Sequence, residues 1–535
     1  MSETSLAAES AYGAKHMVVS PHHLASAAGA AILERGGNAF DAAVAVSACL
    51  AVVYPHMTGM GGDSFWLTYH SSDSEVRAYN ASGRSGRLAA IEAFAGLGME
   101  AIPTRGPLSA ITVPGMADGW FAVQTKYGKL AFAEVMKTAI AYAEEGFPMS
   151  PDQYENTVKQ EQTLRRFPHT SAIYLPDGKI VKPGERFKQR ELAASLRLIA
   201  EQGRDAFYKG PIAESIATAL QEQGGLLTMD DFAEHSGEWV KPIKGSYRGY
   251  DVYQVPPNSQ GFVAIMALQI LEHFDIRAMG HGSYDYYHTM VEALKLSFRD
   301  RNLYLTDPAF ADIPLDRLLS KPYAEQLAAA IKSGQASPID SRPVGSDTAY
   351  AAVVDSEGNS VSFIQSLYFE FGSGFTAGNT GILLQNRGSF FSLDSNHVNC
   401  LQPRKRTFHT LMPAMACKGG KPAYLFGTQG GEGQPQTQLA VFTRMVDFGM
   451  NPQQAVSEPR FVWGRTWGAP TLELKIEGRI GGEVADRLSE AGHLVRVMND
   501  VDGIMGHAHA IAIAPDGSGL SGGADPRSDG AAIGG

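Results

Sequence analysis

The chain has 535 residues, enough for two to four domains or for one large unit with two lobes. Hydrophobic residues make up 44% and charged residues 19%, as in ordinary soluble proteins, and no apolar run is long enough to cross a membrane. The formal net charge is −11 and the basic residues are scattered, so neither nucleic acid nor a membrane is an expected partner. Small molecules are the expected ligands.

The first residues and the cysteines bear on the cellular compartment. Residues 1–10 contain neither the basic region nor the apolar stretch of a secretion signal, so the cytoplasm is the expected location. Three cysteines, Cys49, Cys400 and Cys417, are too few for a disulfide framework. We interpret them as packing residues.

The N-terminal part predicts closely packed helices followed by strands. Residues 21–36 form an alanine-rich helical pattern that ends at two glycines, and a second helix begins at Asn38 and continues to about Val53. Residues 64–69 and 75–79 then have the pattern of a pair of strands. Because both helices are rich in small side chains, we expect them to pack closely.

The middle of the chain, residues 116–335, predicts mostly amphipathic helices, such as 132–145 and 284–302, with one strand at 250–255. A stretch rich in proline, serine and glycine follows over residues 333–346 and has the composition of an exposed, flexible loop. It is the strongest boundary in the sequence.

The region beyond this boundary is rich in predicted strands. They lie at 348–354 and 360–367 and near 407–416 and 422–427, and they are followed by a helix at about 434–448 and a helix–strand tail from about 482. Helices on both sides of a strand-rich centre predict a layered α+β domain with its sheets inside.

The first two of these strands form a predicted hairpin with polar residues at its end. The turn residues 355–359 join the strands, and a symmetric loop places Val354 opposite Ser360. Counting back along both strands places Thr348 opposite Ser366, with Cβ atoms roughly 4.5–5.5 Å apart. The alternative is an inert threonine–serine pair in a sheet, and a slip of one residue would separate the two side chains.

Short sequence blocks, several of them rich in glycine, are spread along nearly the whole chain. They include GGNAFDAAVA at 36–45, TGMGGD at 58–63, DT at 347–348, GTQGG at 427–431 and ADPRS at 524–528. No single block is decisive, but the set in this order resembles the γ-glutamyltransferase family of N-terminal-nucleophile hydrolases. The resemblance implies a four-layer αββα sandwich, an α+β fold made as a single proenzyme.

In this family the precursor is cut before its nucleophile, which here matches Thr348. The resemblance therefore implies cleavage between Asp347 and Thr348, giving a large subunit of residues 1–347 and a small subunit of residues 348–535. The cut has a chemical reason, because an amide nitrogen cannot act as a base whereas a free α-amine has a pKa of about 7.7–8 and can take the hydroxyl proton. Ser366 matches the hydroxyl residue that hydrogen-bonds the nucleophile.

Other site residues follow from the resemblance or depart from it. Gly430 and Gly431 match the pair whose N–H groups form the oxyanion hole. The residues that hold the α-carboxylate and α-amine of glutamate in γ-glutamyl enzymes are mostly replaced. The positions concerned carry Ser82, Tyr368, Arg387, Phe390, His409 and Thr410, and Arg84 stands two positions beyond Ser82.

These departures favour an anionic substrate. Loss of an acidic and an amide partner removes the means of holding an ammonium group, and Arg387 adds one for holding an anion. The pattern looks more like the branch of oxamate amidohydrolases and cephalosporin-acylase-like proteins. Oxamate, held by Arg387 and Arg84, is the leading substrate, and another small acyl amide is the alternative.

Two other hypotheses stay open. One is a γ-glutamyltransferase or glutathione hydrolase with a rebuilt pocket, and the other is a binding protein that keeps the fold without catalysis. Water or an acceptor amine could resolve the acyl-enzyme, so acyl transfer also stays open. For the oligomeric state, a dimer of large–small subunit pairs stays open.

No cofactor and no metal is expected. The glycine clusters lack the context of a nucleotide-binding loop. His507 and His509 could share one strand face, but without acidic or cysteine neighbours they are weak evidence for a metal. His409 is assigned to substrate contact or packing, and the basic run 404–406 to a solvated turn or the pocket rim.

Overall fold

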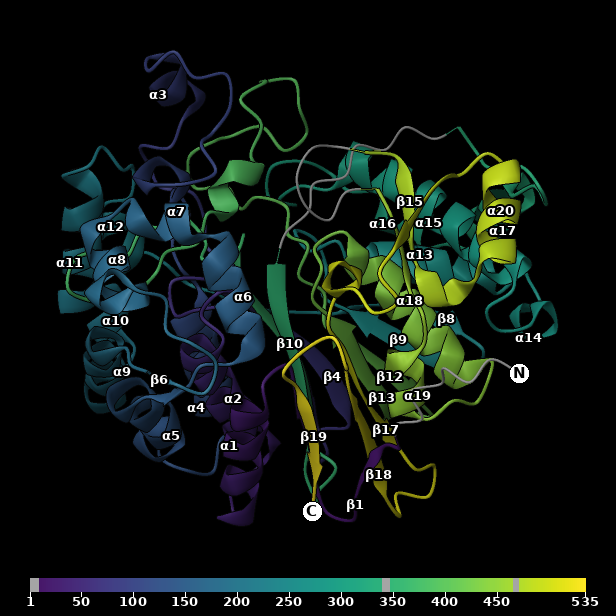
Figure 1. The fold of residues 1–535 in the computed structure, drawn as a ribbon, viewed down its shortest axis with the longest axis horizontal. Coiled ribbons are helices and arrows are strands. Elements are labelled where there is room, and N and C mark those ends of the chain that lie inside the picture. Colours follow the sequence, from purple (N-terminus) through teal and green to yellow (C-terminus); the bar gives the residue numbers. More distant parts are fainter. Residues whose placement is uncertain (1–8, 339–346, 465–470) are drawn as a thin grey trace.

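The computed structural model describes residues 9–338, 347–464 and 471–535. Within them, two seven-stranded sheets face each other between outer layers of helices (Figure 1). One sheet, called the β10 sheet, has the order β19 (Ala531–Gly534), β2 (Met17–Ser20), β10 (Asp347–Val354), β11 (Ser360–Tyr368), β3 (Asp63–His70), β4 (Glu75–Ala81) and β7 (Glu238–Val240). The other, the β13 sheet, has the order β1 (Ala11–Gly13), β18 (Leu520–Ala524), β17 (Ala508–Ile513), β13 (Lys421–Thr428), β12 (Ala414–Lys418), β9 (Tyr250–Gln254) and β8 (Ile243–Tyr247). The predicted αββα sandwich is confirmed.

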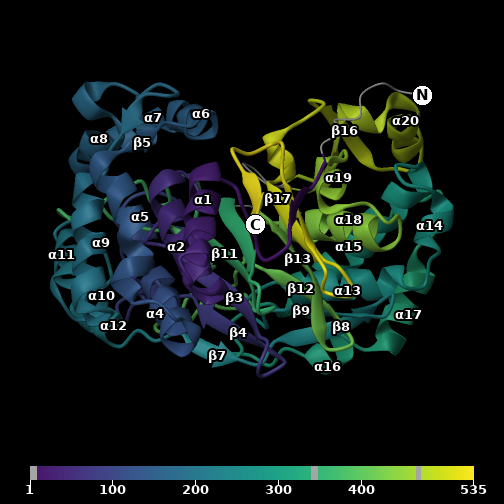
Figure 2. The same ribbon diagram turned by 90° about the horizontal axis from the view of Figure 1, so that it is seen from below.

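The outer face of the β10 sheet is covered by α1 (His23–Glu34), α2 (Ala39–Val53) and α4 (Met116–Tyr127), and α5 (Phe132–Glu145) packs against the far side of α2 (Figure 2). The helices α1, α2 and α5 were expected from the sequence. Asn38 begins α2 with a capping box, in which its side chain accepts from the N–H of Asp41 while the Asp41 carboxylate accepts from the N–H of Asn38. A Cβ on Gly29 of α1 would lie 2.5 Å from a methyl of Val46, so the close contact of α1 with α2 requires the glycine.

The outer face of the β13 sheet is covered by α13 (Phe262–Leu271), α18 (Gly433–Val446) and α19 (Pro452–Ser457), and α15 (Tyr284–Tyr304) packs against α13 and α18. The helices expected at 284–302 and 434–448 are confirmed. The expectation of one strand in the middle region was wrong, because β7 and β8 accompany β9, and the two-residue strands β5 (Phe147–Pro148) and β6 (Arg186–Phe187) pair separately. The strands β7 and β8 are edge strands with few buried side chains, so their sequences lack the alternation that marks a half-buried strand. The strand expected from 407 begins only at Ala414.

The two sheets pack against each other through a core that contains Leu67, Tyr350, Ile364 and Met415. Side chains alternate along β10, so Tyr350 points into this layer and Ala349 points toward the helices. Thr348 is two residues from Tyr350, and alternation therefore assigns it the same parity, which means the same face of the strand. A Cβ on Gly427 of β13 would clash with the Tyr350 ring, so the sheets approach closely here. The parity places the Thr348 side chain at the end of the inter-sheet layer.

The predicted hairpin register is confirmed from Val354 opposite Ser360 to Ala349 opposite Gln365. It then shifts by one residue, because Asp347 lies opposite Tyr368. Two residues of β11, Ser366 and Leu367, therefore span the position of Thr348, and the predicted facing pair becomes a β-bulge. Bulges re-aim side chains at strand ends, which a count along two regular strands does not anticipate.

The boundary expected at 333–346 lies partly outside the described residues. No described helix is long and apolar enough to span a bilayer. Cys49, Cys400 and Cys417 are all buried thiols, as expected for packing residues, and burial raises the pKa of Cys417 to about 12.

Candidate active site

Thr348 is fully buried at the start of β10. The Gln434 side chain donates a hydrogen bond from Nε2 to Thr348 Oγ1 at 3.3 Å. Gln434 stands in the first turn of α18, on the chain that follows the end of β13. The hydroxyl of the candidate nucleophile therefore lies where the two sheets and the start of a helix meet.

Ser366 is buried on the neighbouring strand, and its Cα pairs with that of Asp63 on β3. Its Oγ accepts a hydrogen bond from the Tyr368 N–H at 2.7 Å. Tyr368 has φ +86, a left-handed conformation that is costly for a tyrosine. The end of β11 thus folds back on Ser366 beside the bulge.

Gly430 and Gly431 lie in the short turn between β13 and α18, with φ values of +116 and +53. Only glycine adopts such values without strain. The carbonyl of Gly431 accepts a hydrogen bond from Gln260 Nε2 at 3.1 Å, which fixes the turn. The turn leads to Gln434 and so shares the neighbourhood of Thr348.

Arg387 is a buried cation, with only 1% of its surface exposed. Its guanidinium carbon lies 4.3 Å from the centre of the Tyr368 ring and 5.2 Å from that of Phe390. None of its three side-chain nitrogens has a hydrogen-bond partner among the described residues. Burial lowers the pKa of Arg387 to about 10, so the group is still charged at neutral pH.

A buried pair of Asp63 and His409 lies next to this arginine. Nε2 of His409 is 3.0 Å from one oxygen of Asp63, and the other oxygen accepts from the N–H groups of Gly83 and Gly115. Burial, with the nearby Arg387 charge, lowers the pKa of His409 to about 4, so the ring is neutral and its Nε2–H donates to the carboxylate. Nδ1 is then an acceptor, and it has no described partner.

Comparison with known proteins places this arrangement in a family. The family model described as gamma-glutamyltranspeptidase matches residues 25–535. The chain belongs to this family. It is 62% identical over 526 residues to the glutathione hydrolase-like YwrD proenzyme of Bacillus subtilis (strain 168), covering 98% of this chain and 99% of that one.

Two further relatives span the whole chain. The oxamate amidohydrolase proenzyme of Klebsiella pneumoniae is 41% identical over 523 residues, covering 97% of this chain and 98% of that one. The crystal structure of cephalosporin acylase from Bacillus halodurans superposes with a TM-score of 0.92 at 36% identity, covering 100% of this chain and 98% of that one. The chain is thus an N-terminal-nucleophile hydrolase of this family that acts on amide bonds, and it is made as a proenzyme.

The remaining family positions lie in different surroundings. Ser82 is buried, and its Oγ donates to Asn80 at 2.6 Å. Thr410 is buried and its carbonyl accepts from Gln260 Nε2 at 3.0 Å. Arg84 is paired with Asp307 at 3.2 Å and Glu238 at 2.9 Å. The expected second cation is therefore already neutralised, and no described contact joins it to Arg387.

The basic run 404–406 and the two C-terminal histidines also make internal contacts. Arg406 pairs with Glu238 at 2.9 Å. His507 Nδ1 lies 2.9 Å from the Tyr54 hydroxyl, and His509 Nδ1 accepts from the N–H of Asp525 at 3.3 Å. Lys405 and Arg406 are buried, so the expected solvated turn was wrong for these two residues, and the internal contacts of both features favour a structural role.

A three-residue cluster of metal-binding type lies elsewhere, formed by His288, Glu292 and His493. The Lys295 ammonium lies 2.8 Å from Glu292 and 3.4 Å from His493 Nδ1. A protein cation therefore already occupies the neighbourhood, and the cluster has the contacts of an internal ion pair.

Asp63 and the orphaned state of Arg387 were missed in the sequence. Asp63 ends the TGMGGD block, but its partner His409 is 346 residues away. The signal that could have found the pair is an acidic residue at the end of one family block together with a histidine at a substituted substrate-binding position of another.

Proposed function

We propose that the chain is an autoprocessing threonine amidohydrolase that cleaves the amide of a small anionic substrate. The precursor is cut between Asp347 and Thr348 into the large and small subunits, residues 1–347 and 348–535. The buried hydroxyl of Thr348, the adjacent Ser366 and the turn of Gly430 and Gly431 support this proposal.

The mechanism follows from these groups. The α-amine freed at Thr348 takes the hydroxyl proton, and Oγ attacks the amide carbonyl to give an acyl-enzyme. The N–H groups of Gly430 and Gly431 stabilise the oxyanion, and one such donor is typically worth about 10²–10³ in rate. The α-amine returns the proton to the leaving nitrogen, and water then hydrolyses the ester. Ser366 and Gln434 orient the hydroxyl.

The observation that carries the substrate proposal is the orphaned cation Arg387. A buried charge is costly unless it is paired and hydrogen-bonded, and no described side chain supplies the pairing. A carboxylate on the acyl half of the substrate would accept from the guanidinium and restore the missing bonds. Arg387 therefore selects acyl groups with a carboxylate close to the scissile amide.

Oxamate is the leading substrate because its carboxylate is joined directly to the amide carbon. The neutral His409 adds an acceptor, Nδ1, that can receive an N–H of the scissile amide. The same chemistry would suit another short acyl amide with a carboxylate near the carbonyl. Arg84 is not part of this proposal, because its charge is already paired.

Hydrolysis of a γ-glutamyl amide is the second candidate, favoured by the high identity to the glutathione hydrolase-like relative. A γ-glutamyl group carries an α-ammonium that needs an acidic or amide partner. Asp63 is the nearby carboxylate, but its oxygens already receive bonds from His409 and two backbone N–H groups. This saturation favours the purely anionic acyl group.

Mass spectrometry of the purified protein tests the cleavage. Wild type is expected to give two fragments, with Thr348 as the first residue of the smaller one. Thr348→Ala should remain one inactive chain, and Thr348→Ser should be cut and partly active. Full activity in an uncleaved chain would disprove the mechanism.

Assay of the processed enzyme with oxamate and with a γ-glutamyl anilide tests the substrate. Release of ammonia from oxamate, with little anilide turnover, is expected. Fast turnover of the anilide with no turnover of oxamate would show that a γ-glutamyl amide, and not oxamate, is the substrate.

A further inference from the structure

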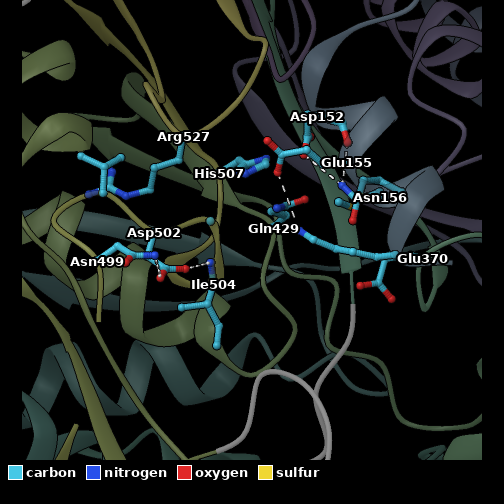
Figure 3. A pocket seen from close by; sticks show the side chains of 14 residues that line it. Asp152, Glu155, Asn156, Glu370, Gln429, Asn499, Asp502, Ile504, His507 and Arg527 are labelled. Atoms are coloured by element: carbon cyan, nitrogen blue, oxygen red, sulfur yellow. Dashed lines mark hydrogen bonds and ion pairs between the residues drawn. The ribbon is translucent and has the colours of Figure 1, made fainter. Parts of the chain in front are cut away.

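A cavity of about 490 Å³ is lined by α6 (Pro151–Lys159), by residues 499–504, and by Glu370 and Gln429 (Figure 3). Its volume is in the range of about 300–1,000 Å³ that is typical of small-molecule sites. Ammonia, the leaving group from oxamate, would fill only a small part of it. The cavity therefore has room for an amine with a chain of several carbon atoms.

Three lining residues connect the cavity to the candidate active site. Gln429 directly precedes Gly430 of the oxyanion turn, and Glu370 stands two residues after Tyr368. The carbonyl of Met57 accepts from the N–H of Leu367 at 3.1 Å, next to the bulge on β11. The cavity thus borders the segments that surround Thr348.

The charge of the lining is predominantly negative. Four carboxylates, those of Asp152, Glu155, Glu370 and Asp502, line the cavity together with the cations Lys159 and Arg527. The Arg527 charge is engaged by other carboxylates, with Nη2 2.6 Å from Glu477 and Nη1 3.1 Å from Asp525. Lys159 lies 3.8 Å from Glu155. A cationic ligand is therefore favoured over an anionic one.

Gln429 provides a second, independent sign of a ligand. It is only 3% exposed, and its Oε1 has no hydrogen-bond donor among the described residues. Figure 3 shows it at the centre of the group, with Asp152 and Glu155 on one side and Asp502 on the other. A buried amide oxygen without a donor is costly, and an N–H from a bound amine would satisfy it.

The carboxylate of Asp152 is held in place by its neighbours. Its Oδ2 accepts from the Tyr54 hydroxyl at 2.6 Å and lies 3.2 Å from His56 Nε2. Its Oδ1 accepts from Asn156 Nδ2 at 3.0 Å. The side chain is 19% exposed, so its negative charge faces the cavity from a fixed position.

We propose that this cavity binds the amine half of the substrate and selects amines that carry a second, cationic group, such as the mono-amide of an alkyl diamine. The proposal rests on the proposed function, in which Arg387 holds the acyl half. Thr348 Oγ attacks the carbonyl carbon, the C–N bond breaks, and the hydroxyl proton passes through the α-amine to the leaving nitrogen. The free diamine leaves, and water releases the carboxylic acid from the ester.

Binding to the processed enzyme tests the cavity without any chemical step. Calorimetric titration with 1,4-diaminobutane is expected to show at least tenfold tighter binding than with the neutral 1,4-butanediol. The double variant Glu155→Gln/Asp502→Asn should weaken diamine binding by about 3- to 20-fold, since each partly exposed charge contributes modestly. Equal binding of the two probes, or an unchanged affinity in the double variant, would overturn the proposal.

The double variant Glu201→Gln/Glu222→Gln is the matched control. Glu201 is exposed on α9 (Arg190–Gln202) and Glu222 is exposed directly after α11 (Pro211–Gln221), and neither lines the cavity, so the net charge changes equally while the cavity is kept. Circular dichroism of both double variants should match wild type. Weakening by the control as large as that by the cavity variant would show a non-specific charge effect and would also count against the proposal.

The turnover of two matched amides tests the amine selectivity of the cavity separately from the proposed acyl specificity. The kcat/KM for N-(4-aminobutyl)oxamate is expected to exceed that for N-(4-hydroxybutyl)oxamate by at least fivefold in wild type, and the ratio should fall in Glu155→Gln/Asp502→Asn. Equal turnover of both amides overturns the amine selectivity while the acyl assignment stands. Tight diamine binding with no cleavage of oxamate or either amide supports the cationic site and overturns the oxalyl assignment instead.

Discussion

The buried arginines of two regions differ in the hydrogen-bond acceptors that surround their charges. Arg460 and Arg527 lie among Asp525 and Glu477, and Arg460 donates further bonds to the carbonyls of Val456 and Gly506. Arg387 lies against two aromatic rings with no described acceptor. Burial lowers the pKa of both Arg387 and Arg460 to about 10, so burial alone does not separate them.

The difference lies in the partners. A network of paired charges holds segments of the fold together, whereas a buried charge without hydrogen-bond partners is retained at a cost that a ligand can offset. We therefore assign the Arg460–Arg527 cluster to the stability of the fold and Arg387 to substrate binding.

Replacement of the orphaned cation should have the largest effect on activity. In Arg387→Met, kcat/KM for oxamate is expected to fall by about 10²- to 10⁴-fold, since each charge-assisted hydrogen bond is worth about 1.5–3 kcal/mol. Stability should be unchanged or increased by about 1–3 kcal/mol, because an unpaired buried charge is removed. Steady-state kinetics and chemical denaturation measure the two quantities. A large loss of stability would show that the cation has a structural partner.

Replacement of an arginine in the paired Arg460–Arg527 cluster should have the opposite outcome. Arg527→Met leaves Glu477 and Asp525 buried with fewer partners and should cost about 3–5 kcal/mol of stability. Denaturation midpoints compared with those of Arg387→Met check this. Any folded Arg527→Met should keep most of its activity per folded molecule. A stable but inactive variant would contradict the assignment.

The pH dependence of stability distinguishes the neutral His409 from an ionised one. Its pKa is about 4 in the folded protein and about 6.5 when unfolded, so the unfolded state binds the proton more readily between these values. The stability that the protein has while this ring is neutral is complete above pH 6.5. It is lost as the pH falls to 4, and the free energy of unfolding decreases by about 3 kcal/mol at most. His409→Gln should show a smaller acid loss over this window in denaturation series. An unchanged slope would mean that His409 is not buried as a neutral ring.

A smaller effect is expected at Ser337, beside the buried cluster of His288, Glu292, Lys295 and His493. The Ser337 N–H donates to the Glu292 carboxylate at 2.9 Å, which anchors the chain shortly before the proposed cleavage site. Ser337→Pro removes this donor and should cost about 1 kcal/mol and slow precursor cleavage, as followed by mass spectrometry. Ser337→Ala keeps the N–H and is the control. Equal cleavage rates in both variants would argue against the anchor.

Much of the fold could be predicted from local patterns. Hydrophobic periodicity and Asn38 gave α1 and α2 within a few residues, and the turn at 355–359 set the register of β10 and β11 up to Ala349. The edge strands β7 and β8 were not predicted, because few of their side chains are buried and their sequences therefore lack an alternating pattern.

The sequence by itself determined the reaction class, because the order of family blocks and the Asp347–Thr348 junction depend on residue identity alone. The tertiary structure decided which charges are available for a substrate. The same arginine side chain is paired at Arg84 and orphaned at Arg387, and only the folding of distant segments produces that difference. Hydrogen-bond partners such as Asp63 and His409, 346 residues apart, are likewise set by packing and leave no local trace in the chain.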